Sequence, residues 1–317
     1  MRVFIAGATG DLGRPLVRQL IAQKHEVFGL TRSPAKYQQL EDLGAAVVVA
    51  DVFDAASLEK ELRRIAPTHV FHLLTALPKQ APLRPSDFTK TNRLRELGTA
   101  NLLRAAIAAK AKRILGESFI GVYGYGGGES PNIETDPLRD GERWPWLQKI
   151  VNALRSLEDQ LFLANRQGLI EAIPLRYGLL YGAGIASTQA IFRTLQRRVM
   201  PILRDPQGVA SFIHSEDATS ATLAAMEVGQ PGTAYNVVDE EPASMNEFIR
   251  YAAVVSGAAP PWELPVWLLR LIVPAVPAIF SARLSASNGK AKRELGWTPR
   301  FPTYREGLQE AMAEERK

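Results

Sequence analysis

The chain has 317 residues, of which 46% are apolar and 22% charged, which suits one large α/β domain or a domain with a smaller lobe. It contains no cysteine, which excludes disulfides, thiolate metal sites and thiol nucleophiles, so redox chemistry would need a bound cofactor. The formal net charge is +5, but basic and acidic residues are interspersed, and this pattern argues against a nucleic-acid partner.

The first half of the chain alternates short apolar runs with longer segments of helical period. This alternation predicts a parallel sheet with helices on both faces. We expect strands at residues 3–6, 26–30, 46–50, 69–74, 113–116 and 170–175, and helices at residues 12–23, 35–43, 56–65, 87–109 and 147–166. The fold class is therefore α/β, a doubly wound parallel sheet of the Rossmann type.

The rhythm changes after Arg176, where loops rich in Gly and Pro begin. We expect a helix at 189–198, a strand at 210–214, a helix at 215–227 and a strand at 234–238. The predicted dinucleotide-binding domain covers residues 1–175 and about 210–240, and an interleaved substrate lobe covers about 176–209 and 241–317. The apolar stretch 264–284 is interrupted by three prolines, which argues against a membrane span.

A glycine-rich turn links the first predicted strand to the first predicted helix. It reads Gly7-Ala8-Thr9-Gly10-Asp11-Leu12-Gly13, in the context that a dinucleotide fingerprint requires. Gly7 permits a tight turn, Gly10 lets the backbone approach phosphate, and Gly13 lets helix pack on strand. We expect backbone amides and the helix dipole to hold a pyrophosphate here.

The end of the second strand distinguishes NAD from NADP, because an acidic residue there binds the ribose hydroxyls whereas a basic one meets a 2′-phosphate. Here the chain reads Leu30-Thr31-Arg32-Ser33, with no carboxylate. Arg32 can bind a phosphate, and Arg14 is a second candidate. NADP(H) is therefore favoured over NAD(H).

Residues after the third and fourth strands complete the predicted cofactor site. Asp51 and Val52 are placed to meet the adenine, although Asp51 is equally suited to cap the next helix. Leu74, Thr75 and Ala76 are expected beside the ribose and phosphates.

With these motifs the chain resembles the extended short-chain dehydrogenase/reductase superfamily, also described as NAD-dependent epimerase/dehydratase. The resemblance covers nearly the whole length and rests on residues 7–13, 51–54, 98–103, 122–124, 175–177, 181–182, 212–217, 235–238 and 292–297. It implies an enzyme that binds a nicotinamide dinucleotide and a small molecule, and a homodimer formed through the helices 87–109 and 147–166. The absence of cysteine indicates a cytoplasmic protein. The N-terminus, which begins a strand at once, shows no secretory signal.

The resemblance also implies a Tyr-x-x-x-Lys pair, in which the lysine lowers the tyrosine pKa from about 10. Alignment on Glu158 places Ile150 at the tyrosine and Leu154 at the lysine, and neither side chain can move a proton. The Ser or Thr expected four residues before Tyr123 is Phe119, and the helix asparagine is Arg95. These departures indicate an atypical member that keeps the cofactor site and lacks the usual proton relay.

Other polar groups near the expected nicotinamide are candidates to replace that relay. Our catalytic candidates are Ser118, Tyr123, Tyr125 and Tyr177, and Glu117 and Arg95 lie in the same region. Parallel sheets of this kind bind their ligands at the carboxyl ends of the strands, which favours these positions. A half-buried tyrosine with no chemical role is the alternative for each ring.

Several other chemistries lack their sequence signals. The four histidines have no metal-ligand spacing, and there is no Gly-x-Ser-x-Gly elbow or phosphate-binding Gly-Lys-Ser/Thr. The first hypothesis is an NAD(P)(H)-dependent oxidoreductase or epimerase-like enzyme acting on a small carbonyl or hydroxyl substrate. The alternatives are a redox-inactive dinucleotide-binding sensor or scaffold, and a non-redox lyase or isomerase that uses the same pocket.

Overall fold

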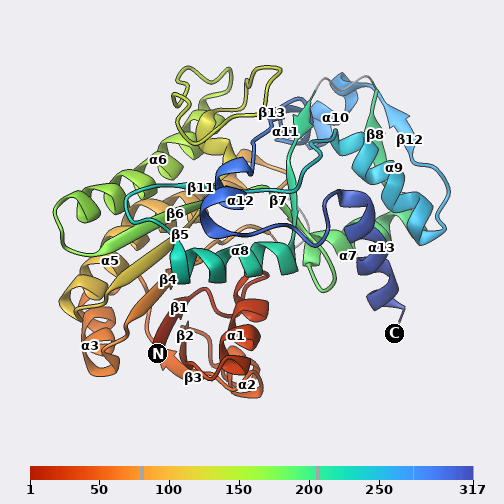
Figure 1. Cartoon of the computed structure of the whole chain (residues 1–317). Helices are drawn as coiled ribbons and strands as arrows, with labels where there is room; N and C mark the ends of the chain where they lie inside the picture. The colour runs from red at the N-terminus through yellow and green to blue at the C-terminus, as the bar shows by residue number, and fades with distance from the viewer. Residues whose placement is uncertain (79–81, 205–207, 274, 317) are drawn as a thin grey trace.

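A seven-stranded parallel sheet forms the larger part of the computed structural model, which describes residues 1–78, 82–204, 208–273 and 275–316 (Figure 1). Across the sheet the strands are β3 (Ala46–Val49), β2 (Glu26–Thr31), β1 (Arg2–Ala6), β4 (His69–His72), β5 (Arg113–Phe119), β6 (Glu171–Tyr177) and β11 (Tyr235–Val237). The order reverses between β1 and β4, which confirms the predicted doubly wound sheet and locates the ligand crevice at their carboxyl ends.

Helices cover both faces of the sheet, because successive strand residues point to opposite sides. Val3 and Ile5 pack against α1 (Gly13–Ala22) on one face, whereas Phe4 and Ala6 join a core with α3 and α5 on the other. The first face is also covered by α2 (Tyr37–Asp42), α8 (Ser215–Val228) and α12 (Gly289–Leu295), and the second by α3 (Ala55–Ile65), α5 (Thr99–Ala108) and α6 (Pro145–Arg166).

The long helix expected at 87–109 is interrupted in the structure. It consists of η2 (Pro85–Phe88), α4 (Thr89–Arg93), a π-helical turn η3 (Leu94–Gly98) and α5. The Thr99 hydroxyl donates to the Arg95 carbonyl over 2.6 Å within this turn, and His72 of β4 bonds the same hydroxyl over 2.9 Å. A π turn inside a helix often marks a functional site.

The smaller lobe lies beside the carboxyl end of the sheet (Figure 1). Its core stacks Phe212 on Phe248, with ring centroids 4.5 Å apart. It contains α7 (Ala186–Gln196), α9 (Met245–Ser256), α10 (Val266–Ile272), α11 (Ala275–Phe280), α13 (Tyr304–Glu315) and the strand pairs β7 (Leu179–Tyr181) with β10 (Phe212–His214), β8 (Pro201–Leu203) with β12 (Trp262–Leu264), and β9 (Val209–Ala210) with β13 (Arg283–Leu284). The remaining short elements are η1 (Pro34–Lys36) and η4 (Ile120–Tyr123).

Local signals set the ends of several helices. Asp54 caps α3 by accepting from the Ser57 amide, and Ser244 with Glu247 forms a capping box at the start of α9. The apolar stretch 264–284 forms short elements, and in the described part of the chain no helix is both long and apolar enough to cross a bilayer. Pro274, one of the three prolines in that stretch, lies outside the described residues.

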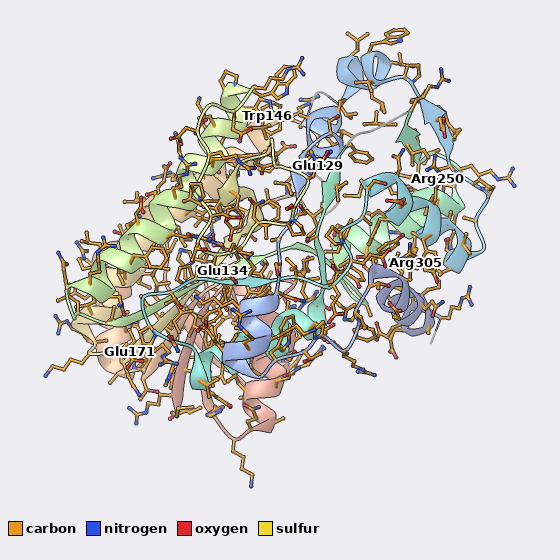
Figure 2. All side chains as sticks on the ribbon, turned by 45° about the horizontal axis from the view of Figure 1, so that its top comes forward. Glu129, Glu134, Trp146, Glu171, Arg250 and Arg305 are labelled. Atoms are coloured by element: carbon orange, nitrogen blue, oxygen red, sulfur yellow. The ribbon has the colours of Figure 1, made fainter. Side chains whose placement is uncertain are left out.

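The two lobes meet around the segment that follows η4. The Glu134 carboxylate, near the centre of the molecule in Figure 2, accepts from the Asn236 amide of β11 over 2.8 Å. The helix α12 packs on the sheet side of this junction, because Ala291 and Leu295 belong to the same core as β11 and α1. The proposed division of residues 241–317 remains a prediction.

A buried carboxyl at this junction leads to a pH prediction. Asp239 is 2% exposed, and burial, reinforced by Glu241 and Asp217, raises its pKa to about 8. Because the unfolded chain ionises this group near pH 4, the folded protein binds one more proton between about pH 4 and 8, and stability falls as pH rises through that window. In urea titrations, the free energy of unfolding of Asp239→Asn minus that of the parent should increase by about 2–4 kcal/mol from pH 5 to pH 8. The exposed Glu240→Gln should show no such gain, and a pH-independent difference for Asp239→Asn would contradict the prediction.

Candidate functional site

The glycine turn between β1 and α1 has no room for side chains at two positions. Gly7 has φ +104°, and a Cβ there would lie 2.3 Å from the Leu73 carbonyl oxygen. A Cβ on Gly13 would lie 2.1 Å from the Gly7 carbonyl oxygen. These two glycines therefore let α1 start directly beside β1 and β4.

The start of α1 is suited to bind phosphate. Gly10 is exposed, and its amide donates to the Gly7 carbonyl over 2.9 Å, which closes the turn. Leu12 occupies the N-cap position and offers no side-chain acceptor to the first amides of the helix. A helix start without a side-chain cap matches the expected pyrophosphate site.

Three cations lie around this turn, of which two were expected. Arg32, at the end of β2, bonds the Asp51 carboxylate over 3.4 Å and is 67% exposed, and the exposed Lys36 of η1 donates to the Thr9 hydroxyl over 3.1 Å. Arg14 points toward the smaller lobe, where it donates to the Gly184 carbonyl over 3.0 Å. Sequence reasoning missed Lys36, although a basic residue soon after Arg32 was a signal for it.

The remaining predicted cofactor residues follow β2, β3 and β4 at the carboxyl edge. Thr31 forms a tight turn, because its hydroxyl accepts from the Ser33 amide over 3.2 Å. Asp51 accepts from the Phe53 amide over 3.0 Å, while the helix cap is supplied by Asp54. The buried Val52 accepts from the Asn101 amide group over 3.0 Å through its carbonyl.

The segment after β4 continues the same edge. The Leu74 amide donates to the His72 ring over 3.4 Å, and the Ala76 amide donates to the Thr91 hydroxyl over 2.9 Å. Thr75 between them is exposed. The predicted cofactor positions therefore gather along one edge of the sheet, as a dinucleotide site requires.

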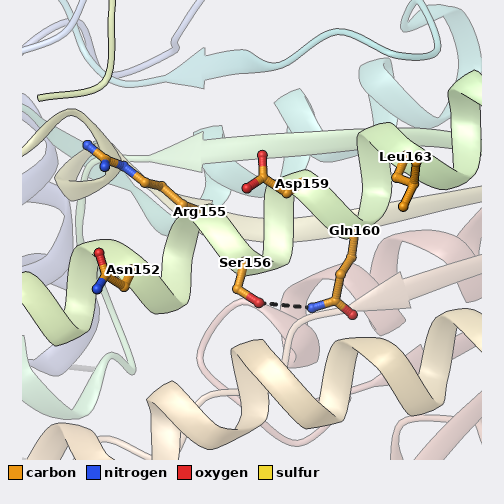
Figure 3. A pocket seen from close by; sticks show the side chains of 6 residues that line it. All are labelled: Asn152, Arg155, Ser156, Asp159, Gln160 and Leu163. Carbon is orange, nitrogen blue, oxygen red and sulfur yellow. Dashed lines mark hydrogen bonds between the residues drawn. The ribbon is translucent and has the colours of Figure 1, made fainter. Parts of the chain in front are cut away.

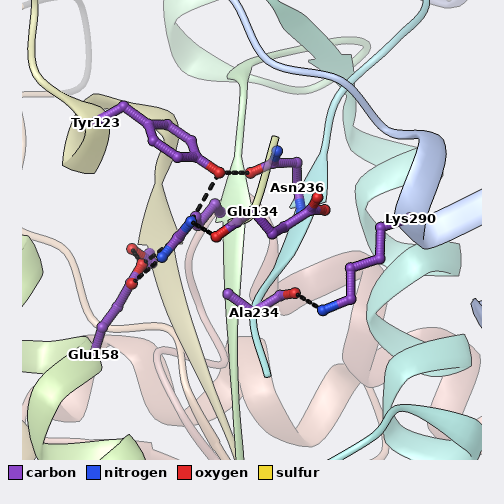
Figure 4. Close-up of polar contacts among 8 residues, drawn as sticks. Tyr123, Glu134, Glu158, Ala234, Asn236 and Lys290 are labelled. Carbon is purple, nitrogen blue, oxygen red and sulfur yellow. Dashed lines mark hydrogen bonds and ion pairs between the residues drawn. The ribbon is translucent and has the colours of Figure 1, made fainter. Parts of the chain in front are cut away.

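Two of the four catalytic candidates belong to a buried polar network (Figure 4). The Ser118 hydroxyl donates to Glu158 over 2.6 Å, and Arg176 binds the same carboxylate through two hydrogen bonds of 2.9 and 2.6 Å. Arg176 also donates to the Tyr123 hydroxyl over 2.8 Å, and this hydroxyl donates to Asn236 over 2.9 Å. The register places Ser118 directly beside Arg176, so the β5–β6 pairing builds the network.

The pKa values of the tyrosines argue against a base at neutral pH. Burial raises the pKa of Tyr123 to about 12, despite the neighbouring Arg176. Tyr177 bonds the Thr222 hydroxyl over 2.6 Å, and burial raises its pKa far above the ordinary value. Burial likewise raises the pKa of Tyr125. In each case burial outweighs the groups that lower the tyrosine pKa.

Apolar side chains occupy the stretch of α6 where the sequence predicted the missing pair. Ile150 is 1% exposed and Leu154 is fully buried, and both pack in a cluster with Tyr123 and Tyr125. Figure 1 shows α6 running along the sheet toward the lobe junction. Neither residue presents a polar group to this part of the site.

Glu117 points to the opposite face of β5 from Ser118. A Cβ on Gly116 would lie 2.6 Å from Leu161 of α6, so Gly116 and Ser118 face α6 and Glu117 faces away from it. Burial raises the Glu117 pKa to about 7, Arg95 lowers it, and Asp11 of the glycine turn raises it. This carboxyl therefore titrates near neutrality beside the expected cofactor path.

A cavity of about 400 Å³ opens beside Tyr125. Aromatic and apolar walls come from Tyr125, Trp144, Leu147, Pro277 and Ala278. The rest of the lining includes both charges, from Arg139, Asp140, Glu142 and Arg143. Because Leu147 and Tyr125 also belong to the cluster around Ile150, the cavity lies next to the expected nicotinamide end and suits a small aromatic or apolar substrate.

The loop 139–144, which forms part of the cavity wall, is held in place by several hydrogen bonds. Glu142 accepts from the Tyr125 amide over 2.7 Å, and Gln148 accepts from the Gly141 and Glu142 amides over 3.0 and 2.9 Å. Arg155 of α6 bonds Asp140 and the Arg139 carbonyl. The cavity wall is thereby fixed to α6.

A second, shallower depression lies along the outer face of α6 (Figure 3). The Gln160 amide group donates to the Ser156 hydroxyl and to the Glu96 carbonyl, each over 3.1 Å, which links α6 to η3. Its lining contains none of the predicted cofactor or catalytic residues and consists of Asn152, Arg155, Ser156, Asp159, Gln160 and Leu163. The cavity beside Tyr125, in contrast, is lined by one of the catalytic candidates.

Comparison with known proteins extends the resemblance. The family model described as "NAD dependent epimerase/dehydratase family" matches residues 3–238. The structure is similar to UDP-glucose 4-epimerase from Thermotoga maritima, solved with UDP-glucose, at 23% identity and a TM-score of 0.81, covering 100% of this chain and 99% of the epimerase. This likeness supports the fold.

Several curated relatives are reductases by name, among them two that match nearly the whole chain. A 3-diazoavenalumate denitrifying reductase from a Streptomyces species is 35% identical over 313 residues, covering 97% of this chain and 99% of the relative. A ceramide reductase from Caulobacter vibrioides is 29% identical over 320 residues, covering 96% of this chain and 88% of the relative.

Proposed function

Since the chain belongs to the NAD-dependent epimerase/dehydratase family, we propose that it is an NADPH-dependent reductase of a small aromatic acid that carries a diazo group. The family and the relatives establish an oxidoreductase or epimerase-type enzyme. The observation that carries the finer proposal is the pairing of a glycine turn that has no room for side chains at Gly7 and Gly13 with an apolar surface, Ile150 and Leu154, at the predicted proton relay.

The residues present fit a phosphorylated dinucleotide. The cradle without side chains at Gly7 and Gly13 admits the pyrophosphate beside the start of α1. Arg32, which bonds Asp51 after β3, and Lys36, which bonds Thr9 of the glycine turn, can both donate charge-assisted hydrogen bonds to a 2′-phosphate. These contacts support NADP(H) over NAD(H).

The absent relay restricts the reaction. Reduction of a carbonyl needs a proton for the developing alkoxide, and the Tyr123 and Tyr177 hydroxyls bond to buried partners. Bound NADPH would supply hydride, and hydride with an arenediazonium cation gives the arene and N₂, because the C–N bond breaks as the C–H bond forms. Where an ortho hydroxyl has ionised, the product is a phenolate that takes its proton from water, so no acid in the site is needed. The apolar wall of Ile150 and Leu154 would exclude water from the site while needing no acid or base.

The pocket supports a small substrate. Its volume of about 400 Å³ and its walls of Tyr125 and Trp144 suit one aromatic ring with a short substituent. The relative that is named for a diazo acid matches nearly the whole chain, including the segments that form this cavity. We also retain the cytoplasmic location and the homodimer through α5 and α6 as predictions, the latter to be tested by sedimentation.

The decisive experiment follows the transferred hydrogen. The purified protein, NADPH and a 2-diazophenol carrying a side-chain carboxylate should give NADP⁺, N₂ and the parent phenol in equal amounts, above the rate without protein. With NADPH deuterated at C4, the label should appear at the carbon that lost nitrogen, whereas unlabelled NADPH in D₂O should leave that carbon unlabelled.

Other outcomes would identify the competing functions. Turnover of a carbonyl panel without reaction of the diazo acid would indicate an ordinary ketoreductase with a relocated proton donor. Tight NADPH binding without hydride transfer to either class would indicate a redox-inactive sensor or scaffold. Conversion of a substrate without a net change in cofactor oxidation state would indicate a lyase or isomerase.

A further inference from the structure

We propose that Arg95, together with Tyr125, forms a receptor for an anionic oxygen of the substrate, a carboxylate or a phenolate. This inference deepens the proposed function, because it selects acids among the substrates that fit the cavity. The inference rests on the proposed function because the receptor is placed beside the expected nicotinamide end. Its test, however, measures only ligand binding and needs no enzymatic turnover.

The first support is a buried cation with an unused donor. Arg95 is 7% exposed, and its Nε has no hydrogen-bond partner among the residues that the structure describes. A desolvated guanidinium costs several kcal/mol unless an anion or acceptors compensate it. Burial lowers the Arg95 pKa, which is the sign of that desolvation. A ligand anion would supply the missing partner.

The second support is the position of Arg95 in the fold. It lies on the π-helical turn η3, where the Thr99 hydroxyl bonds its carbonyl and fixes the wider turn. The ionisable groups that act on the guanidinium are Tyr125 and Glu117. Tyr125 lines the 400 Å³ cavity, so Arg95 neighbours a residue of the pocket where the substrate is expected.

The third support is the charge of the surrounding groups. Glu117 is the carboxyl that acts on Arg95, and burial raises its pKa to about 7, so below neutrality it is largely uncharged. Burial also keeps Tyr125 protonated and able to donate a hydrogen bond. It keeps His72, whose ring bonds the Thr99 hydroxyl, neutral, with a pKa of about 4. Arg95 is thus an uncompensated cation below about pH 7, which is the condition for binding an anion.

A titration of binding tests the receptor. The NADP⁺-loaded protein is titrated calorimetrically with two acids, 4-hydroxycinnamate and benzoate, and with their uncharged methyl esters. We expect at least one acid to bind, with its ester at least tenfold weaker. The methyl esters lack the carboxylate, whereas 4-methoxycinnamate keeps the carboxylate and lacks the ionisable phenol. Weak binding of the esters alone would identify a carboxylate ligand, and weak binding of 4-methoxycinnamate would identify a phenolate ligand.

Two variants of Arg95 and one control assign the effect. Arg95→Gln should weaken binding of the acid at least tenfold, Arg95→Lys less, and the exposed Lys90→Gln on α4 should change it less than twofold. The Kd for NADPH should change less than twofold in all three, which shows that the fold and the cofactor site are intact. Weakening of NADPH and acid by the same factor would assign Arg95 a structural or cofactor role and overturn the proposal.

The pH profile gives an independent readout. As pH rises from 6 to 8.5, Glu117 ionises beside Arg95, with Asp11 and Tyr177 as its other charged or titratable neighbours, and the acid should bind progressively more weakly. Glu117→Gln should remove this dependence. Binding of neither acid, or unchanged acid binding by Arg95→Gln, would overturn the receptor, whereas acid binding without hydride transfer would overturn only the reductase.

Discussion

Replacing both Arg32 and Lys36 by alanine is expected to raise the Kd for NADPH about 100-fold, a loss of about 2.7 kcal/mol. Each cation can donate a charge-assisted hydrogen bond to the 2′-phosphate, and such bonds contribute about 1.5–3 kcal/mol, reduced here because Arg32 is 67% exposed and screened by solvent. NADH has no 2′-phosphate, so its Kd should change less than threefold.

Fluorescence titration of both coenzymes at two salt concentrations measures this effect. The effect should shrink at high salt, because exposed charges are screened. A double variant of the exposed α3 residues Lys60 and Arg63 removes the same charge away from the site and serves as the control. Equal weakening of NADPH and NADH, or no change in either, would contradict the assigned NADP preference.

The second large effect concerns the buried ion pair between Glu158 and Arg176. Their side chains are 2% and 5% exposed, so Glu158→Gln leaves the Arg176 guanidinium buried without its partner. We expect the free energy of unfolding to fall by about 3–5 kcal/mol in urea titrations. Glu26→Gln, which removes an exposed partner of Arg2, should cost less than about 1 kcal/mol.

A double variant tests whether the Glu158–Arg176 pair serves only to stabilise the fold or also takes part in cofactor binding. The double substitution Glu158→Leu with Arg176→Met removes both charges and should recover at least half of the lost stability, because an apolar pair can replace a buried ion pair. NADPH affinity should remain within about threefold of the parent in any variant that still folds. Loss of NADPH binding by folded Glu158→Gln protein would place this network in the cofactor site instead.

The network also changes how the tyrosine candidates are understood. Ser118, Tyr123 and Tyr177 are catalytic candidates because they lie at or just after the carboxyl ends of strands near the expected nicotinamide. Their catalytic role remains a prediction, but each hydroxyl bonds to a buried partner, Glu158, Asn236 or Thr222. Tyr125 is the candidate that both lines the cavity and interacts with Arg95, and we retain it as the substrate-facing tyrosine.

The sheet, most of its helices and the glycine turn after the first strand could be predicted from the amino-acid sequence. These features depend on local signals: periods of 2 and 3.6 residues, and glycines at Gly7 and Gly13 where a Cβ would collide with backbone. Backbone geometry of this kind can be predicted from a few consecutive residues. The carboxyl edge of the sheet then follows from strand order alone.

Which polar side chains already have buried hydrogen-bond partners became known from the three-dimensional structure. Ser118 and Glu158 are 40 residues apart, and Tyr123 and Asn236 are 113 apart, so no local pattern reveals that they bond to each other. The placement of Lys36 beside Thr9 and the π turn that carries Arg95 likewise depend on how elements pack. Local sequence restricts the backbone, whereas the partner and the charge of a buried side chain are set by segments that folding brings together from distant parts of the chain.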